Sequence, residues 1–239
     1  MIVLFTDFGL AGPYTGQVQA VLQQQAPGIP AISLFSDLTP FDIEAAAVLL
    51  PAYTRTLPPG SVCLCVVDPG VGSSRQGCVL QADGRWYVGP DEGLFTYIER
   101  RSNRTTSFCL PDNEAASPSF HGRDIFAPAT AYLARNGRAS ERWGACKLHS
   151  RVDWPDELYR VVYLDRFGNA ITGVRASSVA ETTMLQVNGH ALQHATTFAD
   201  VEVGQAFWYE NSNGLVEIAV NQGSASDLLG ITTASIIRF

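Results

Sequence analysis

Six consecutive apolar residues, VCLCVV at positions 62–67, constrain the fold of this chain more than any other stretch. The run does not alternate between apolar and polar residues, so it predicts a β-strand that is covered on both faces. Sheets with such strands are largely parallel and carry helices on both sides. The run ends at Asp68, and a turn that contains two glycines follows before Arg75. The sequence therefore predicts an α/β fold with a polar loop at the end of a buried strand.

Strand-like and helix-like stretches alternate along residues 1–153. Apolar residues at helical spacing predict a helix over 14–25, and Thr39 with Asp42 three residues later predicts the start of the next. Asp83-Gly84 predicts a hairpin turn. The other strands are expected at 2–5, 31–35, 62–67 and 105–110, and the other helices at 91–100 and 124–135. This alternation indicates an α/β N-terminal domain, residues 1–153, with a largely parallel sheet.

The pattern changes near Trp154 to short β-rich runs. Asn188-Gly189 and Asn213-Gly214 are strong hairpin signals, and only residues 176–181 resemble a helix. The runs cover 159–165, 169–174, 184–193, 206–220 and 231–239. We therefore expect a smaller all-β, barrel-like C-terminal domain, residues 154–239.

The composition excludes several classes of function. The net charge is −7 and Lys147 is the one lysine, so the chain lacks the basic clusters that bind nucleic acid. The five cysteines form no C-x-x-C pair, and reduced, buried thiols are the expected state, with no metal site. No apolar run is long enough to span a membrane, and the chain opens with a strand and not with a signal sequence. We expect a cytoplasmic protein with a small-molecule ligand.

Two acids follow predicted strands of the α/β domain. Asp7 closes the first strand and Asp68 closes the run at 62–67. Ligands of open α/β sheets bind beyond the carboxyl ends of the strands, so both acids are candidates for one crevice. The alternative is that each is a turn or capping residue, which is the commoner role of an Asp after a strand. For Arg75 the alternative is a solvated surface arginine.

Three further segments carry candidate residues. His121 lies just before the helix expected at 124, where a helix N-terminus favours neutral imidazole. Asp165, Phe167 and Asn169 combine an acid, a flat apolar ring and an amide, which suits a cationic amine and a heteroaromatic base. Ser212 lies in a predicted hairpin loop that could meet a carboxylate. By themselves, the last two segments are better explained as tight turns.

Together, seven segments resemble the family of S-adenosylmethionine hydroxide adenosyltransferases, the hydrolase branch of the superfamily that includes the fluorinase and the chlorinase. They are TDFG (6–9), LTPFD (38–42), VVDPGVGSSR (66–75), GPDEGL (89–94), FHGRD (120–124), DRFGN (165–169) and NSNGLVEIAVNQGSA (211–225). Their order along nearly the whole chain is far more specific than any one of them. The resemblance implies an α/β domain, a β-barrel domain and a homotrimer with its active sites at subunit interfaces. It implies a hydrolase that releases adenosine and L-methionine, with no cofactor.

The resemblance also assigns roles to residues. Asp68, Arg75 and His121 match the triad associated with the nucleophilic water. Asp7 matches the acid that holds the ribose hydroxyls, and Phe41 belongs to the matching LTPFD segment. On the second domain, Asp165 matches the acid that faces the methionine amine and Ser212 the hydroxyl near the methionine carboxylate. Phe167, Asn169 and the backbone near Gln222 match the adenine side.

Two alternatives and two departures remain. A halogenase needs a halide pocket, and a carboxylate at position 68 disfavours one. A protein that binds the same ligand without turnover has no use for a water-activating triad. Asn213 stands where halogenases have an arginine, which leaves the contact to the methionine carboxylate open, and Tyr14 is larger than the residue in those relatives. The residues alone do not decide whether Asp68 or His121 is the base.

Overall fold

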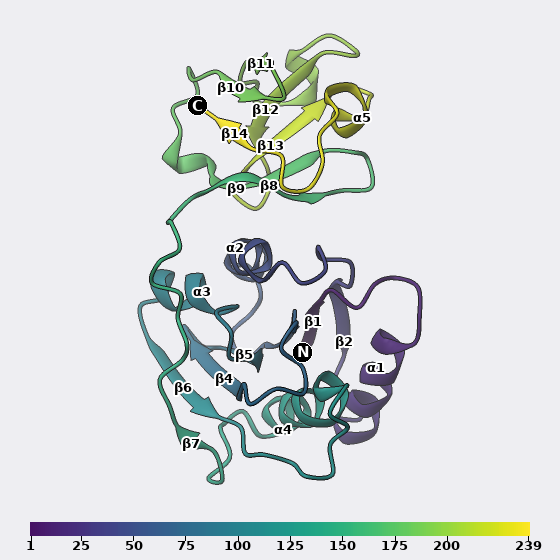
Figure 1. Cartoon of the computed structure of the whole chain (residues 1–239), viewed down its shortest axis with the longest axis vertical. Coiled ribbons are helices and arrows are strands. Elements are labelled where there is room, and N and C mark those ends of the chain that lie inside the picture. The colour runs from purple at the N-terminus through teal and green to yellow at the C-terminus, as the bar shows by residue number, and fades with distance from the viewer. The chain divides into compact units, whose positions relative to one another are not determined.

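We describe the chain from a computed structural model, which covers all residues from Met1 to Phe239. The chain folds into two compact units, Met1–Val152 and Asp153–Phe239, and each is described by itself. Figure 1 labels the elements of both units. None of the helices is long and apolar enough to cross a membrane.

A seven-stranded sheet forms the centre of the first unit, in the order β2-β1-β3-β5-β4-β6-β7. The pairs β2–β1, β1–β3 and β3–β5 are parallel, and the remaining pairs are antiparallel. Since β6 is antiparallel to β4 and β4 to β5, only β4 and β7 run against the other strands, which makes the sheet mixed and mostly parallel. The strands are β1 (Ile2–Thr6), β2 (Ala31–Phe35), β3 (Val62–Val66), β4 (Gly77–Ala82), β5 (Arg85–Pro90), β6 (Thr105–Cys109) and β7 (Gly144–Ala145).

Helices cover both faces of this sheet (Figure 1). This is expected from β3, in which all five residues are buried and apolar residues do not alternate with polar ones. Val18 and Leu22 pack with Leu4 and Leu64 on the face of α1 and α4. On the other face, ring contacts run from Phe5 through Phe35 to Tyr53 of α2. The helices are α1 (Tyr14–Gln25), α2 (Ile43–Thr54), α3 (Thr96–Arg101) and α4 (Ala127–Asn136), with a π-helical turn η1 (Gly122–Phe126) directly before α4.

Three predicted helix starts are wrong by a few residues. Asp42, not Thr39, caps α2: its Oδ1 accepts the Ala45 amide at 3.0 Å. The helix expected from 91 begins only at Thr96, because the residues before it form a loop after β5. The segment expected to be a helix from 124 starts at Gly122 as a π-helical turn, and α4 itself begins only at Ala127. The hairpin at Asp83-Gly84 is confirmed, and both residues have the positive φ of a type I′ turn.

The second unit consists of two antiparallel sheets, β12-β13-β9-β8 and β11-β10-β14. Their apolar faces enclose a core that includes Trp208, Val216 and Ile218. The all-β character is confirmed, whereas a closed barrel stays a prediction. The strands are β8 (Leu158–Leu164), β9 (Ala170–Arg175), β10 (Leu185–Val187), β11 (His190–Leu192), β12 (Ala206–Glu210), β13 (Leu215–Val220) and β14 (Ile237–Arg238).

Both hairpin signals of this unit are confirmed. Asn188 and Gly189 join β10 to β11 with positive φ, and the loop with Asn213-Gly214 joins β12 to β13. The prediction missed the helix α5 (Ala225–Leu229), which Ser224 caps by accepting the Asp227 amide. The other helical turns are η2 (Ala176–Ser178) and η3 (Phe198–Asp200).

Candidate active site

The two acids that close predicted strands lie at the same edge of the sheet. Strands β1 and β3 are parallel neighbours with Thr6 opposite Val66, so Asp7 and Asp68 both follow the carboxyl ends. The pKa of Asp7 is raised, first by burial and to a lesser extent by the charge of Asp68. The Phe41 amide, which donates to Oδ2 of Asp7 at 3.2 Å, opposes that shift. The crevice expected from strand polarity therefore contains both carboxylates.

Arg75 joins Asp68 to His121. Its Nε donates to Oδ1 of Asp68 at 2.7 Å, and its Nη2 donates to Oδ2 of the same carboxylate. The same Nη2 lies 2.9 Å from Nδ1 of His121. The side chains of Arg75 and Asp68 are only 5% and 6% exposed, which excludes the alternative of a solvated surface arginine. Asp68 and Arg75 thus form one hydrogen-bonded cluster with His121, which lies 46 positions after Arg75.

Glycines allow the loop after Asp68 to bring Arg75 back to it. Gly72 has φ +81°, and a Cβ there would lie 2.7 Å from the carbonyl oxygen of Pro118. This close contact packs the loop against the segment that leads to His121. At Gly70 a Cβ would collide with the carboxylate of Glu92. The guanidinium of Arg75 also lies over the ring of Phe126, at 5.2 Å.

The contact with Arg75 fixes the protonation state of His121. A guanidinium has only donors, so Nδ1 of His121 must accept, and the imidazole then carries its proton on Nε2. The pKa of His121 is lowered, first by burial and then by the positive charge of Arg75, although Asp68 and Asp124 oppose the shift. His121 is therefore neutral at pH 7, and its Nε2–H is a donor.

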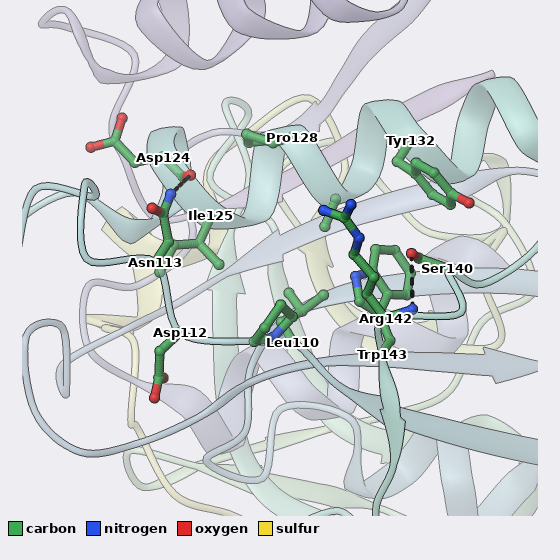
Figure 2. A pocket seen from close by; sticks show the side chains of 12 residues that line it. Leu110, Asp112, Asn113, Asp124, Ile125, Pro128, Tyr132, Ser140, Arg142 and Trp143 are labelled. Atoms are coloured by element: carbon green, nitrogen blue, oxygen red, sulfur yellow. Dashed lines mark hydrogen bonds between the residues drawn. The ribbon is translucent and has the colours of Figure 1, made fainter.

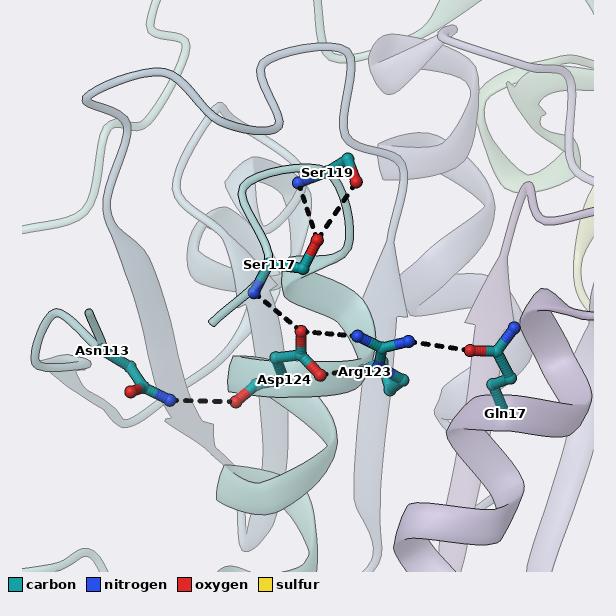
Figure 3. Close-up of polar contacts among 6 residues, drawn as sticks. All are labelled: Gln17, Asn113, Ser117, Ser119, Arg123 and Asp124. Carbon is teal, nitrogen blue, oxygen red and sulfur yellow. Dashed lines mark hydrogen bonds and ion pairs between the residues drawn. The ribbon is translucent and has the colours of Figure 1, made fainter. Parts of the chain in front are cut away.

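A second set of polar contacts supports the segment around His121 (Figure 3). Asp124 accepts two hydrogen bonds from Arg123, at 2.6 and 2.9 Å, and one from the Ser117 amide at 2.9 Å. Arg123 also donates to Gln17 of α1 at 2.9 Å, and its guanidinium lies over the Phe120 ring. Sequence reasoning treated Asp124 only as a helix start. The adjacent Arg-Asp pair in FHGRD was the available signal for this support.

A cavity of about 340 Å³ lies against the cluster. Four of its lining residues are predicted site residues: Asp7, Phe41, Asp68 and His121. The remainder of the wall is largely apolar, and the rings of Phe8, Tyr14 and Phe120 contact one another there. The cavity is thus lined by two carboxylates, an imidazole and apolar side chains, and the apolar part suits an uncharged organic group.

Arg75 does not line this cavity but a separate, more polar one of about 590 Å³, together with Ser73, Glu92 and His149. A further cavity of about 450 Å³ lies between the loop after β6 and helix α4 (Figure 2). Trp143, Tyr132 and Arg142 line it, and it contains none of the predicted site residues. No group of three or more His, Cys, Asp or Glu side chains in the chain could hold a metal ion.

In the second unit, the segment from Asp165 to Asn169 is the turn between β8 and β9. Oδ1 of Asp165 accepts hydrogen bonds from the backbone amides of Phe167 and Asn169, at 2.8 and 2.9 Å. Oδ2 accepts one from Nδ2 of Asn169, at 3.0 Å. Gly168 has φ +82°. The carboxylate thus stabilises the turn itself, and Phe167 is 75% exposed.

The remaining two predicted residues lie at opposite ends of β13. Ser212 is exposed in the loop before this strand, and Gln222 is exposed just after it, with φ +54°. The chain after Gln222 lies beside the β8–β9 turn, since the Ser226 amide donates to the Gly168 carbonyl at 2.9 Å. Four of the five candidates in this unit therefore lie at one end of the sheet. Ser212 lies in the loop before β13, where the neighbouring Asn211 bonds to Glu217, and the charge of Asp165 acts on this same Glu217.

Comparison with protein families gives two matches. Residues 2–143 match the model for the SAM hydroxide adenosyltransferase N-terminal domain, and residues 159–238 match that for the C-terminal domain. The (R)-S-adenosyl-L-methionine hydrolase of Thermus thermophilus is 39% identical, over 99% of this chain and 98% of its own length. The protein of the same name from Methanocaldococcus jannaschii is 32% identical, over 97% and 92%. A fluorinase from Nocardia brasiliensis is 22% identical, over 94% and 91%.

Two solved structures are also similar to this chain over nearly its whole length. An uncharacterized conserved protein from Thermotoga maritima superposes with a TM-score of 0.87 and 29% identity, covering 99% of this chain and 98% of the other. A conserved hypothetical protein from Thermus thermophilus gives a TM-score of 0.76 and 36% identity with the same coverage. The similarity thus extends over both units.

Proposed function

This chain belongs to the SAM hydroxide adenosyltransferase family, and we propose that it hydrolyses (R)-S-adenosyl-L-methionine to adenosine and L-methionine. The proposal is supported by relatives of that name that are 32–39% identical over nearly the whole chain. The fluorinases are more distant, at 22% identity.

In the proposed reaction, the oxygen of water bonds to C5′ of the ribose. The C5′–S bond breaks, its electron pair stays on sulfur, and the positively charged sulfonium leaves as the neutral thioether of methionine. One proton of the water is released. Because the leaving group needs no proton, the chain has to supply only a positioned nucleophile in line with C5′.

The observation that carries the proposal is the contact of Asp68, Arg75 and His121 beside a cavity that also holds Asp7. We assign proton transfer to Asp68. His121 presents Nε2–H, so it donates a hydrogen bond to the water and cannot take its proton while Nδ1 accepts from Arg75. Arg75 lines the separate, more polar cavity, so its part is to hold Asp68 and His121 in place beside the water.

The substrate contacts are proposed from the family resemblance. Asp7 accepts hydrogen bonds from the ribose hydroxyls, and Phe41, which is 73% exposed, covers the sugar. Asp165 faces the methionine amine and Ser212 its carboxylate. Phe167, Asn169 and the backbone near Gln222 bind adenine.

We further propose a homotrimer, in which the substrate lies between the α/β unit of one copy and the β unit of the next. No cofactor, nucleic acid or membrane takes part, and a cytoplasmic location stays a prediction. Light scattering of the purified protein tests the trimer, and a monomer would exclude a site shared between copies. Dialysis against a chelator is expected to leave the activity unchanged.

The decisive experiment incubates the purified protein with each sulfonium epimer of S-adenosyl-L-methionine and separates the products by chromatography. Equal amounts of adenosine and methionine from the R epimer are expected. A 5′-halo-adenosine that forms only in the presence of chloride would identify a halogenase instead. Tight binding without consumption over a long incubation would identify a binding protein.

A further inference from the structure

Glu217 is a charged residue in the middle of a fully buried strand. It lies on β13, all six residues of which are buried, and it is only 5% exposed. Its carboxylate accepts a hydrogen bond from the Tyr209 hydroxyl at 2.6 Å and one from Nδ2 of Asn211 at 2.9 Å. Burial raises the pKa of Glu217, these two bonds oppose the shift, and the charge of Asp165 adds to it. A buried carboxylate is costly, so its position calls for an explanation.

Asn211 connects this carboxylate to the β12–β13 loop. Its Oδ1 accepts the amides of Asn213 at 2.9 Å and Leu215 at 3.1 Å, so that oxygen must face the loop. The NH₂ group of Asn211 then faces into the sheet, where only an acceptor can satisfy it. Glu217 supplies that acceptor. The orientation of the Asn211 amide, and with it the shape of the loop, therefore depends on Glu217.

The loop itself presents only uncharged donors. Its residues 211–214 are Asn, Ser, Asn and Gly, and Nδ2 of Asn213 lies 3.4 Å from Oγ of Ser212. A cationic side chain attracts a carboxylate from many directions, whereas hydroxyl, amide and backbone N–H donors act only when they point at it. A loop of this composition can recognise an anionic group only if its backbone is held in one shape.

We propose that Glu217 is a positioning residue that, through Asn211, holds the Ser212–Asn213 loop in the shape that binds the methionine carboxylate. This inference rests on the proposed function and extends it to a residue that does not touch substrate. Glu217 is expected to act on substrate affinity and not on the chemical step, because the loop is remote from Asp68, Arg75 and His121 in the sequence and shares none of their contacts.

A donor–acceptor exchange tests the proposal. Asn211→Asp places a second carboxylate against Glu217 and removes the donor between them. When Glu217→Gln is added, the side-chain amide at position 217 can donate to the carboxylate at position 211. That carboxylate can still accept from the backbone amides of Asn213 and Leu215. We expect Asn211→Asp to raise KM for S-adenosyl-L-methionine about tenfold or more at unchanged kcat, since a hydrogen bond to a buried charge is lost. The double variant is expected to return KM to within about twofold of the parent.

Decarboxylated S-adenosylmethionine serves as the matched substrate. It lacks the carboxylate, so its KM is expected to be the same for the parent and for Asn211→Asp. Glu210→Gln is the control variant: Glu210 is an exposed acid next to Asn211, and neither KM is expected to change. If Asn211→Asp does not fold, Tyr209→Phe removes the other donor to Glu217 and is expected to raise KM a few-fold.

Hydrogen exchange of the Asn213 and Leu215 amides separates this inference from the proposed function. Faster exchange in Asn211→Asp, reversed in the double variant, is expected even if the chain does not hydrolyse the substrate. Unchanged exchange and an unchanged KM in Asn211→Asp would overturn the positioning role. An equal rise of KM for both substrates would also overturn it, since the effect would then not pass through the carboxylate.

Discussion

The candidate residues of the two units are held in opposite ways. In the α/β unit, Asp68, Arg75 and His121 are separated by up to 53 positions in the sequence and bond directly to one another in a largely buried cluster. In the β unit, Asp165, Phe167 and Asn169 lie within one turn of five residues, and the turn leaves the Phe167 ring exposed.

The two arrangements suit two different tasks of an enzyme. Activation of a water molecule requires charged groups that are fixed before the substrate arrives and shielded from solvent. Recognition of a ligand requires surfaces that remain open until it binds. Substitutions in the α/β cluster are therefore expected to lower kcat, and substitutions on the β-unit turns to raise KM.

The largest effect is expected from Asp68→Asn. The variant keeps the size of the side chain but loses the proton acceptor and the ion pair with Arg75, so kcat should fall about 10³-fold. Calorimetric titration is expected to show nearly unchanged substrate binding, because Asp7, Phe167 and Asn169 remain. Asp112→Asn, an exposed change on the same unit, is the control. If binding and turnover fell together, Asp68 would be structural and the separation of tasks would fail.

His121 tests whether the cluster needs a donor or a base. His121→Ala is expected to lower kcat about 10²-fold, and His121→Gln should lower it less, because a glutamine amide can place an N–H where Nε2 lies. In the parent, protonation of Nδ1 would oppose Arg75, so activity should fall as the pH drops through the lowered pKa of His121, below the ordinary 6.5. A pH–rate profile measures this loss. Equal rates for the Ala and Gln variants would instead make His121 the base.

On the β unit, Phe167→Ala should raise KM about tenfold at constant kcat, since stacking on a base contributes about 1–3 kcal/mol. The side chain is 75% exposed, so the melting temperature should not change. Steady-state kinetics and thermal unfolding check both parts. A fall in kcat would show that this turn also positions the reacting carbon.

The smallest effects concern Gly70 and Gly72, the two glycines of the loop between Asp68 and Arg75. Gly72→Ala should cost about 1–3 kcal/mol of unfolding free energy, because φ is +81° and the new Cβ meets the rigid carbonyl of Pro118. Gly70→Ala should cost less, since the mobile end of Glu92 can move away. Chemical unfolding of the two variants compares the costs. The reverse order would mean that the loop is held from the Glu92 side.

The sequence predicted much of this arrangement because its signals were local. The apolar run at 62–67 indicated a doubly covered strand, and strand polarity placed Asp7 and Asp68 at one edge. The dipeptides Asp83-Gly84 and Asn188-Gly189 specified their own turns, because both positions require positive φ.

Features that depend on one particular side-chain contact were not predictable in the same way. The exact start of each helix depends on which residue finds an amide to accept, as Asp42 does and Thr39 does not. The contact between Arg75 and His121 was implied only by the family resemblance. The hydrogen bonds of Arg123 to Gln17 and of Asn211 to Glu217 were missed, because the sequence does not show which side chains meet in three dimensions.

The contact between Gly72 and Pro118 has a mechanical consequence. Because a Cβ at position 72 would lie 2.7 Å from the Pro118 carbonyl oxygen, no room is left for a side chain between the loop that carries Arg75 and the segment before His121. A larger residue at position 72 is accordingly expected to fit only if the backbone at Pro118 shifts.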